Sequence, residues 1–392
     1  MRILHFSDAE YQQRMLRVKQ RMQAQDIDVL IVTEPANINY LTGYDAWSFY
    51  TVQALLVFQD VDLPMWIGRS IDKQSAIVTT NLPDERIIPY PDIYVHSPDR
   101  HAAQFIAQML LREAPRAKTV GVEMGAYYYT ARDHAELQKA LPNVAFKDAE
   151  LLVNWVRFIK SEREIAYMRE AGVITERMMK RAVEVAAPGV RQCDVAAAIY
   201  HAQMSGTENY GGLPATSPPH MGFGERAREP HPIFTDRRID TNSVANIELS
   251  GCRLRYHAPM SRTVYFGRPP QSYRDLASYV IEAVETSLDA VRPGVTCEGI
   301  ELAWRKSMSA HGIEKENRLG YSIGIAYTPT WGERTASIRR TDLTVLEPGA
   351  AFHLMGGLWL ANTGITITQS FVVTATGHEP LTATPRELVV KD

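Results

Sequence analysis

The chain has 392 residues, of which 45% are hydrophobic and 22% charged, and its formal net charge at pH 7 is −3. This length suggests two or three domains, and the small net charge gives no long-range field that would attract nucleic acid or an anionic membrane. The three cysteines are widely spaced, which argues against a disulfide framework and predicts a reducing, cytoplasmic location. We expect no signal peptide and no membrane span, because no apolar run approaches the roughly 20 residues that cross a bilayer.

The first part of the chain alternates predicted helices and strands. Ser7-Asp8-Ala9-Glu10 has the pattern of a capping box, and apolar residues then recur at helical spacing from Tyr11 to Met22. IDVLIV, residues 27–32, reads as a short buried strand. QALLVF and DLPMWIG predict further strands, and HAAQFIAQMLLRE predicts another helix. This alternation predicts an α/β domain over residues 1–155.

The second part begins with another capping box, Ser161-Glu162-Arg163-Glu164, which opens a long predicted helix. Further helices are predicted over residues 192–204, 273–291 and 298–311, mixed with strands in antiparallel hairpins. One such hairpin is VANIELSGCRLRYHAPMSRTVYFG, in which two apolar strands flank a turn and a single acid, Glu248, lies on the first strand.

Five segments, in this order, resemble the creatinase, prolidase and methionine aminopeptidase family. NINYLTGYDAW is similar to part of the N-terminal domain of creatinase and prolidase, and VRFIKSEREIAYMREAG to the helix that opens the catalytic domain. REPHPIFTDRRI resembles the catalytic-histidine segment, while LEPGAAFHLMGG and GITITQSFVV resemble the strands that carry two metal-binding glutamates. The resemblance implies a creatinase-like α/β domain over residues 1–155 and an α+β catalytic domain of the pita-bread fold over residues 156–392.

Metal-dependent members of this family hold two ions with five side chains, in the order Asp, Asp, His, Glu and Glu. The resemblance aligns these positions with Glu248, Pro259, Tyr321, Met355 and Thr368. One acid among five positions does not supply the charged oxygens and nitrogens that two divalent ions need. We therefore expect no metal and no other cofactor, with creatinase as the family precedent for a metal-free hydrolase.

Two residues carry the predicted chemistry. His231 stands at the position of the family's catalytic histidine, between Pro230 and Pro232, which stiffen the segment. Glu248 stands on a strand face that the family directs into the active site, where an acid needs a partner. A lone histidine is more often structural than catalytic. The alternative to an enzyme is an inactive scaffold that only binds a solute. The family positions of both residues favour catalysis.

Other polar and aromatic residues are candidates for substrate binding. Tyr321 and Met355 stand at former ligand positions, and His353 shares the strand face of Met355 by period-two alternation. Glu333 and Arg334 are candidates for holding a zwitterion. His353 is equally well read as a core histidine, the orientation of His257 is open, and His220 is read as a loop residue.

The resemblance to creatinase also implies a homodimer in which the first domain of one subunit covers the active site of the other. Trp47 and Tyr50, in the aromatic segment DAWSFY, would then cap a cationic substrate through their ring faces. Ordinary aromatic packing is the alternative reading of these two side chains.

The missing metal ligands argue against a peptide substrate, because a peptide carbonyl needs the polarisation that metal ions provide. A protonated amidine carbon is already electrophilic, so a carboxylate and a histidine suffice to attack it and to move the proton. Within the family the chain is most similar to members that open the cyclic amidine of ectoine, and this resemblance implies a zwitterionic ectoine-like substrate. A creatinase-type amidinohydrolase, a metal-dependent X-prolyl dipeptidase and a non-catalytic solute-binding protein remain the alternatives.

Overall fold

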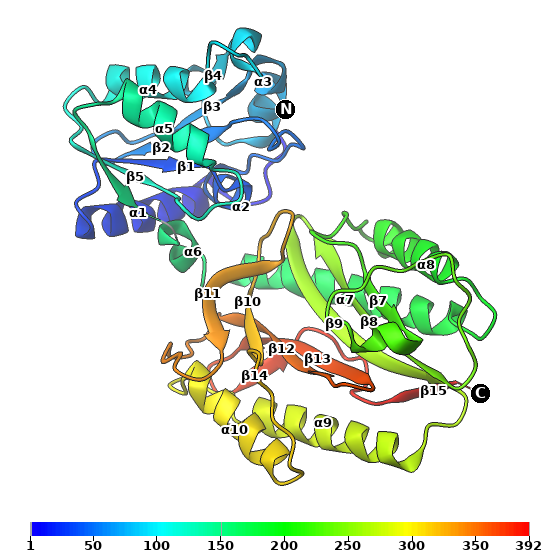
Figure 1. Cartoon of the computed structure of the whole chain (residues 1–392). Helices are drawn as coiled ribbons and strands as arrows, with labels where there is room; N and C mark the ends of the chain where they lie inside the picture. Colours follow the sequence, from blue (N-terminus) through cyan, green and yellow to red (C-terminus); the bar gives the residue numbers. More distant parts are fainter. Residues whose placement is uncertain (1, 150, 392) are drawn as a thin grey trace. The chain divides into compact units, whose positions relative to one another are not determined.

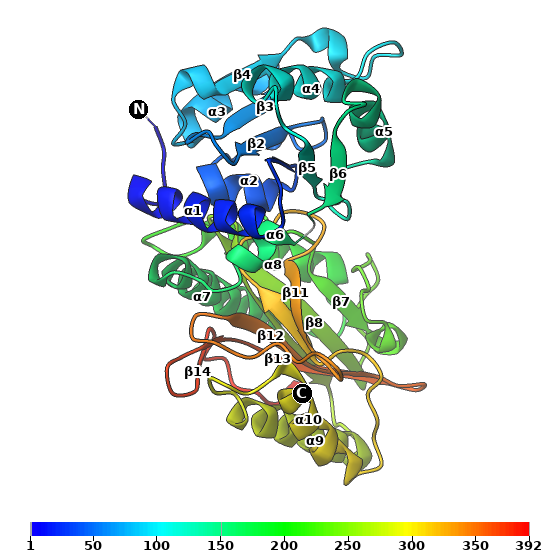
Figure 2. The same cartoon turned by 90° about the vertical axis from the view of Figure 1, so that its left-hand side faces the viewer.

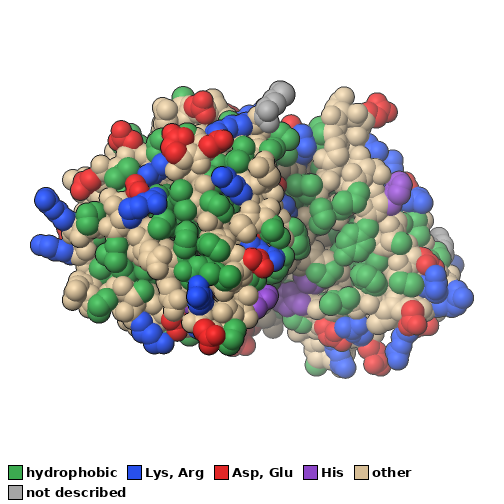
Figure 3. Space-filling model, turned by 90° about the horizontal axis from the view of Figure 1, so that it is seen from above, with side chains coloured by type: hydrophobic (Ala, Val, Ile, Leu, Met, Phe, Trp, Pro, Cys, Tyr) green, Lys and Arg blue, Asp and Glu red, His purple; other side chains and the backbone are tan. Residues whose placement is uncertain are grey.

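The computed structural model describes residues 2–149 and 151–391, and it divides into two compact units, Met1–Arg157 and Phe158–Asp392 (Figure 1). Within the described residues, no helix combines the length and the apolar character needed to cross a membrane. Acidic and basic side chains are interspersed with hydrophobic ones on the face shown in Figure 3, in keeping with the small net charge.

The first unit is built from alternating helices and strands, as the sequence predicted. Its main elements are α1 (Asp8–Ala24), β1 (Val29–Val32), α2 (Pro35–Thr42), β2 (Ala54–Phe58), β3 (Met65–Arg69), α3 (Lys73–Thr79), β4 (Ile87–Tyr90), α4 (Ala102–Glu113), β5 (Thr119–Val122), α5 (Ala131–Ala140), β6 (Ala145–Asp148) and α6 (Leu152–Val156). The short helical turns are η1 (Ser70–Asp72), η2 (Asp84–Arg86) and η3 (Asp92–Tyr94).

The strands of this unit form one mixed six-stranded sheet in the order β4-β3-β2-β1-β5-β6. Strand β1 pairs antiparallel with β2 and parallel with β5, which puts it in the centre, and all four of its residues are buried. Burial on both faces explains the continuous apolar run of β1. Helices α4 and α5 lie on one side of the sheet and α1 on the other (Figure 2).

The second unit contains the longer hairpins. Its elements are α7 (Glu162–Val185), α8 (Gln192–Ser205), β7 (His220–Phe223), η4 (Gly224–Arg228), β8 (Ser243–Arg253), β9 (Tyr256–Phe266), α9 (Gln271–Asp289), α10 (Cys297–Ser309), β10 (Gly320–Ile323), β11 (Gly332–Ile338), β12 (Ala351–Trp359), β13 (Gly364–Val373), β14 (His378–Pro380) and β15 (Val389–Lys391). The three helices predicted after α7 are therefore found within two residues of their expected bounds.

Two sheets of the second unit pack face to face between two pairs of helices. One sheet has the order β15-β9-β8-β7 and the other β11-β10-β12-β13-β14. Helix α7 contacts β8 and β9, helix α9 contacts β12 and β13, and β13 contacts β8 and β9 across the interface of the two sheets (Figure 1). The side chains between the sheets are the ones that build the site.

Helix starts illustrate how local sequence sets these elements. The capping box of α7 is complete, because the Ser161 side chain accepts from Glu164 N at 3.3 Å and the Glu164 carboxylate accepts from Ser161 N at 3.0 Å. At α1 only half of the predicted box is found, where Ser7 Oγ accepts from Glu10 N. Glu10 instead forms an ion pair with Arg14, which is fully buried, at 2.8 Å.

Candidate active site

A row of three side chains crosses the sheet at the middle of β8. Glu248 lies directly opposite Ser261 of β9 on one side and directly opposite His220 of β7 on the other. Directly opposed residues of antiparallel strands project to the same face of the sheet, with Cβ atoms roughly 4.5–5.5 Å apart. His220, Glu248 and Ser261 therefore share the face that packs against β13.

Glu248 is 7% exposed, and burial raises the pKa of its carboxyl to about 7. Desolvation disfavours the charged form of an acid when nothing compensates it. A carboxyl group in this state releases or accepts a proton near neutral pH, which is a property of acid–base groups in active sites.

A chain of hydrogen bonds near this acid joins Trp331, which directly precedes β11, to Tyr321 of β10 and His353 of β12. Trp331 Nε1 donates to the Tyr321 hydroxyl at 2.7 Å, and the same hydroxyl lies 3.2 Å from His353 Nδ1. Burial, followed by the charge of Glu248, raises the pKa of Tyr321, so its phenol stays protonated. The guanidinium of Arg318 stacks over the Tyr321 ring at 4.4 Å from its centroid.

The other end of this chain is fixed by hydroxyl groups. His353 Nε2 lies 2.8 Å from Thr368 Oγ1, which also accepts from Ser261 N at 2.7 Å. Ser261 Oγ lies 2.6 Å from Thr366 Oγ1. Burial lowers the pKa of His353 to about 3, so the ring is neutral and serves as a relay of hydrogen bonds. His353 thus has both a core environment and contact with Tyr321 beside the acid.

His231 and His220 lie next to each other. Their ring centroids are 5.3 Å apart, and the His220 ring is 6.0 Å from that of Trp331. His231 is exposed, whereas His220 is half-buried and its Nδ1 is buried, with no hydrogen-bond partner within residues 2–149 and 151–391. Burial, with a smaller contribution from His231, lowers the pKa of His220 to about 4.

Sequence reasoning missed His220, which it read as a loop residue. The segment SPPHMG has no periodic pattern, and only the pairing of β7 with β8 brings His220 beside Glu248. The one available signal was a second histidine eleven positions before His231. Arg318 was also missed. It precedes a strand of only four residues, which is too short to show a clear periodic pattern.

Comparison with known proteins places this arrangement in a family. The family model described as metallopeptidase family M24 matches residues 166–375, and the model for the creatinase/prolidase N-terminal domain matches residues 14–159. The chain belongs to metallopeptidase family M24. The family resemblance inferred from the sequence, with its pita-bread catalytic domain, is therefore confirmed.

Curated relatives match this M24 protein over nearly its full length. Ectoine hydrolase of Halomonas elongata is 40% identical to it, over 99% of both chains. An uncharacterized hydrolase/peptidase of Sinorhizobium fredii is 34% identical over 98% of this chain and 97% of its own. Such relatives identify the protein as a hydrolase.

Solved structures show the same fold at lower identity. The prolidase of Pyrococcus horikoshii superimposes with a TM-score of 0.81 at 21% identity, covering 96% of this chain and 100% of its own. A prolidase of Thermococcus sibiricus gives a TM-score of 0.85 at 18% identity, covering 97% and 99% of the two chains.

The metal ions of M24 peptidases do not fit the side chains of this site. Pro259 lies opposite Ser250, and its carbonyl accepts from Ser370 Oγ at 2.6 Å, while Met355 lies opposite Thr368. Across residues 2–149 and 151–391, no three His, Cys, Asp or Glu side chains come together in a way that would hold a metal ion. Glu248 is the one carboxylate among the five aligned positions.

Glu333 and Arg334 lie on β11 in different environments. The Glu333 carboxylate is 2.6 Å from Lys160 Nζ, and both side chains are almost completely buried. Lys160 also donates to the carbonyl of Phe158. Arg334 is half-buried and has a φ of 65°, a conformation unusual for a residue with a Cβ. Glu333 thus has a cation of the protein as its partner.

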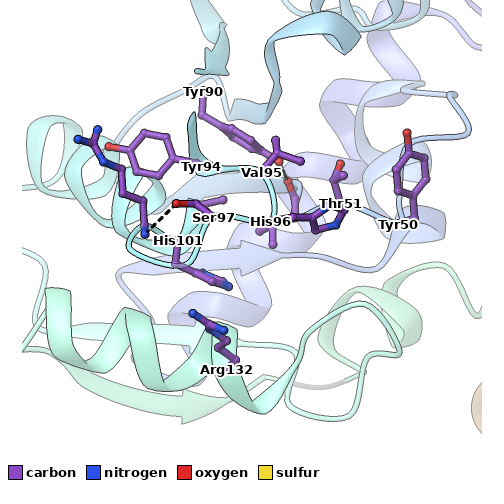
Figure 4. A pocket seen from close by; sticks show the side chains of 12 residues that line it. Tyr50, Thr51, Tyr90, Tyr94, Val95, His96, Ser97, His101 and Arg132 are labelled. Atoms are coloured by element: carbon purple, nitrogen blue, oxygen red, sulfur yellow. Dashed lines mark hydrogen bonds between the residues drawn. The ribbon is translucent and has the colours of Figure 1, made fainter. Parts of the chain in front are cut away.

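Trp47 and Tyr50 belong to the first unit, where they are 59% and 64% exposed. The Trp47 ring packs against Phe49 at 4.8 Å. Tyr50 lines a cavity of about 250 Å³, in which Figure 4 shows Tyr90 and Tyr94 on one side and Arg132 on the other.

Proposed function

We propose that the protein hydrolyses ectoine, opening its cyclic amidine to N-acetyl-2,4-diaminobutyrate without a divalent metal ion. The observation that carries this proposal is the 40% identity with ectoine hydrolase of Halomonas elongata over 99% of both chains. The buried Glu248, alone among the former ligand positions in bearing a charge, supports the chemistry.

In this proposal Glu248 meets the delocalised amidinium of the substrate. A carboxylate beside a cation gains more Coulomb energy in a water-poor site than in bulk water. Burial alone holds the pKa of Glu248 at about 7 in the free protein, so a bound cation stabilises the ionised form and lowers this pKa. The ionised group then attacks the amidine carbon, or takes a proton from a water molecule that attacks it.

His231 is the proposed acid–base group for the leaving ring nitrogen. Tyr321 stays protonated and offers a hydrogen bond beside Glu248. Arg318, whose guanidinium stacks on the Tyr321 ring, is the proposed partner of the substrate carboxylate. Arg334 is the alternative partner. His353 holds Tyr321, and the contributions of Met355 and Glu333 to substrate binding remain predictions.

A homodimer in which Trp47 and Tyr50 cover the neighbour's site is part of the same proposal. Their exposure supports it, because a large aromatic ring on a surface is a common element of an interface or a ligand contact. The ring faces would contribute cation–π attraction to the amidinium.

The test is incubation of the purified protein with ectoine, creatine and an X-proline dipeptide, each before and after exhaustive chelation. Ectoine alone should be consumed, and the product should be N-acetyl-2,4-diaminobutyrate. Glu248→Gln, which keeps the size and removes the charge, should abolish ring opening and weaken ectoine binding. Glu208→Gln, on the exposed surface, is the matched control and should retain the parent rate.

Each contrary result has a distinct meaning. Consumption of creatine in place of ectoine would make the protein a creatinase-type amidinohydrolase. Dipeptide hydrolysis that chelation stops and manganese restores would make it a metallopeptidase. Tight ectoine binding without any product would leave a solute-binding protein.

A further inference from the structure

Three titratable residues on the β7 side of the site differ in how far they are exposed to solvent. Glu248 is buried, His220 is half-buried and directly opposite it, and His231 is exposed with its ring 5.3 Å from that of His220. A group that exchanges protons inside a site needs a path to solvent. His220 is the group that joins the other two.

We propose that His220 is a proton-transfer residue that carries the proton between the reacting groups beside Glu248 and the exposed ring of His231. The inference rests on the proposed function, since it assigns a further residue to the same reaction. It changes how His231 acts, because His231 then exchanges protons with the site through His220.

The hydrogen bonding of His220 is the strongest support. Its Nδ1 is buried and has no partner among the described residues. Buried polar atoms are nearly always hydrogen-bonded, and leaving one without a partner costs about 1–3 kcal/mol. The pairing with Glu248 keeps the ring on the reactive face of the sheet. A nitrogen in this position is available to a substrate, to an attacking water or to the carboxyl group itself.

The surroundings of His220 restrict its movement. Pro218 and Pro219 precede it and limit the backbone of the approach. The rings of Trp331 and His231 both pack near the imidazole, with centroids 6.0 Å and 5.3 Å from its own. Burial lowers the pKa of His220 to about 4, so the ring is neutral at physiological pH, with one nitrogen that accepts a proton or hydrogen bond while the other donates.

The reaction balances with this path. The oxygen of water forms the new bond to the amidine carbon, and the ring C–N bond breaks with its electron pair on nitrogen. Both water protons end on that nitrogen, which leaves as an ammonium group, and nothing is oxidised or reduced. Glu248 takes the first proton when water attacks, and His220 passes protons to the nitrogen and exchanges them with His231.

The experiment compares His220→Gln, His231→Gln and the double variant in ectoine turnover, with ectoine titration and circular dichroism as checks of binding and folding. Loss of general acid–base catalysis lowers rates roughly 10²–10⁴-fold. We expect His220→Gln to lose turnover by about this factor, with ectoine affinity changed by less than about threefold. His231→Gln should have no further effect in the His220→Gln background, because two residues on one path act as a unit.

Chemical rescue separates proton transfer from a structural role. Free imidazole should restore part of the turnover of His220→Ala and none of that of Glu248→Gln. Turnover of His220→Gln within threefold of the parent would overturn the inference, and so would losses that multiply in the double variant. A parent protein inactive on ectoine would instead refute the proposed function, which the same assay measures separately.

Discussion

The raised pKa of Glu248 makes the pH dependence of the reaction a sensitive test of the site. The proposed mechanism needs the ionised carboxylate, and burial puts the pKa of this group at about 7 in the free protein. At pH 5 about 1% of the Glu248 carboxyl groups would be ionised, whereas an ordinary glutamate would be mostly ionised at this pH. We therefore expect kcat/KM for ectoine to fall about 100-fold from pH 8 to pH 5. Below pH 7, a plot of log(kcat/KM) against pH should have a slope near one.

Three neighbouring titratable groups, His220, His353 and Tyr321, do not produce such a fall in rate between pH 8 and pH 5. Burial lowers the pKa of His220 to about 4 and of His353 to about 3, and it raises the pKa of Tyr321. These groups therefore keep one charge state through most of the range. Because kcat reports the substrate complex, in which the amidinium lowers the pKa of Glu248, its limb should lie at lower pH than that of kcat/KM.

The assay measures product formation from pH 5 to pH 9 at constant ionic strength, with samples returned to pH 8 to exclude irreversible unfolding. The limb should persist in His231→Gln at reduced rate, which would show that it does not belong to His231. A value of kcat/KM that stays level between pH 7 and pH 5 would refute the reasoning, because Glu248 would then titrate like an exposed acid.

Three further predictions test other parts of the structure. Turnover should survive exhaustive chelation, with no stoichiometric metal found by elemental analysis; restoration of lost activity by manganese or zinc would contradict this. Mixing Trp47→Ala with Glu248→Gln subunits should recover activity if sites are shared between subunits, and proven heterodimers without recovery would count against sharing. Lys160→Met should lower stability by about 3–5 kcal/mol in urea unfolding, because it leaves Glu333 charged and buried. The Lys160→Met/Glu333→Met double variant should recover most of that loss, and equal stability of the two variants would exclude the ion pair as the cause.

Much of the fold follows from local sequence. The cap of α7 needs only Ser161 and Glu164, and the continuous apolar run of β1 indicates a buried strand. The hairpin of β8 and β9 was also readable, because two apolar strands of equal length flank one turn. Signals of this kind lie within one element or between neighbours in the chain.

The parts of the site that escaped prediction depend on contacts between distant segments. Lys160 and Glu333 are 173 positions apart, and the sequence around neither residue indicates which residue it pairs with. His220 meets Glu248 only after β7 has joined the edge of the sheet. The aligned ligand positions stay a prediction from the family resemblance, because periodicity alone does not distinguish Thr368 from any other strand residue.

The hydrogen bonds of Thr368 make the replacement of this residue by a metal ligand costly. Its hydroxyl holds both His353 Nε2 and the amide of Ser261. Placing a glutamate there, as in a metal-dependent relative, would remove the hydroxyl that joins them, and each buried group left unpaired costs about 1–3 kcal/mol. It would also place a second acid near Glu248 without the other side chains that a metal site needs. The first substitution towards a metal site at Thr368 would therefore lower stability before any metal ion could bind.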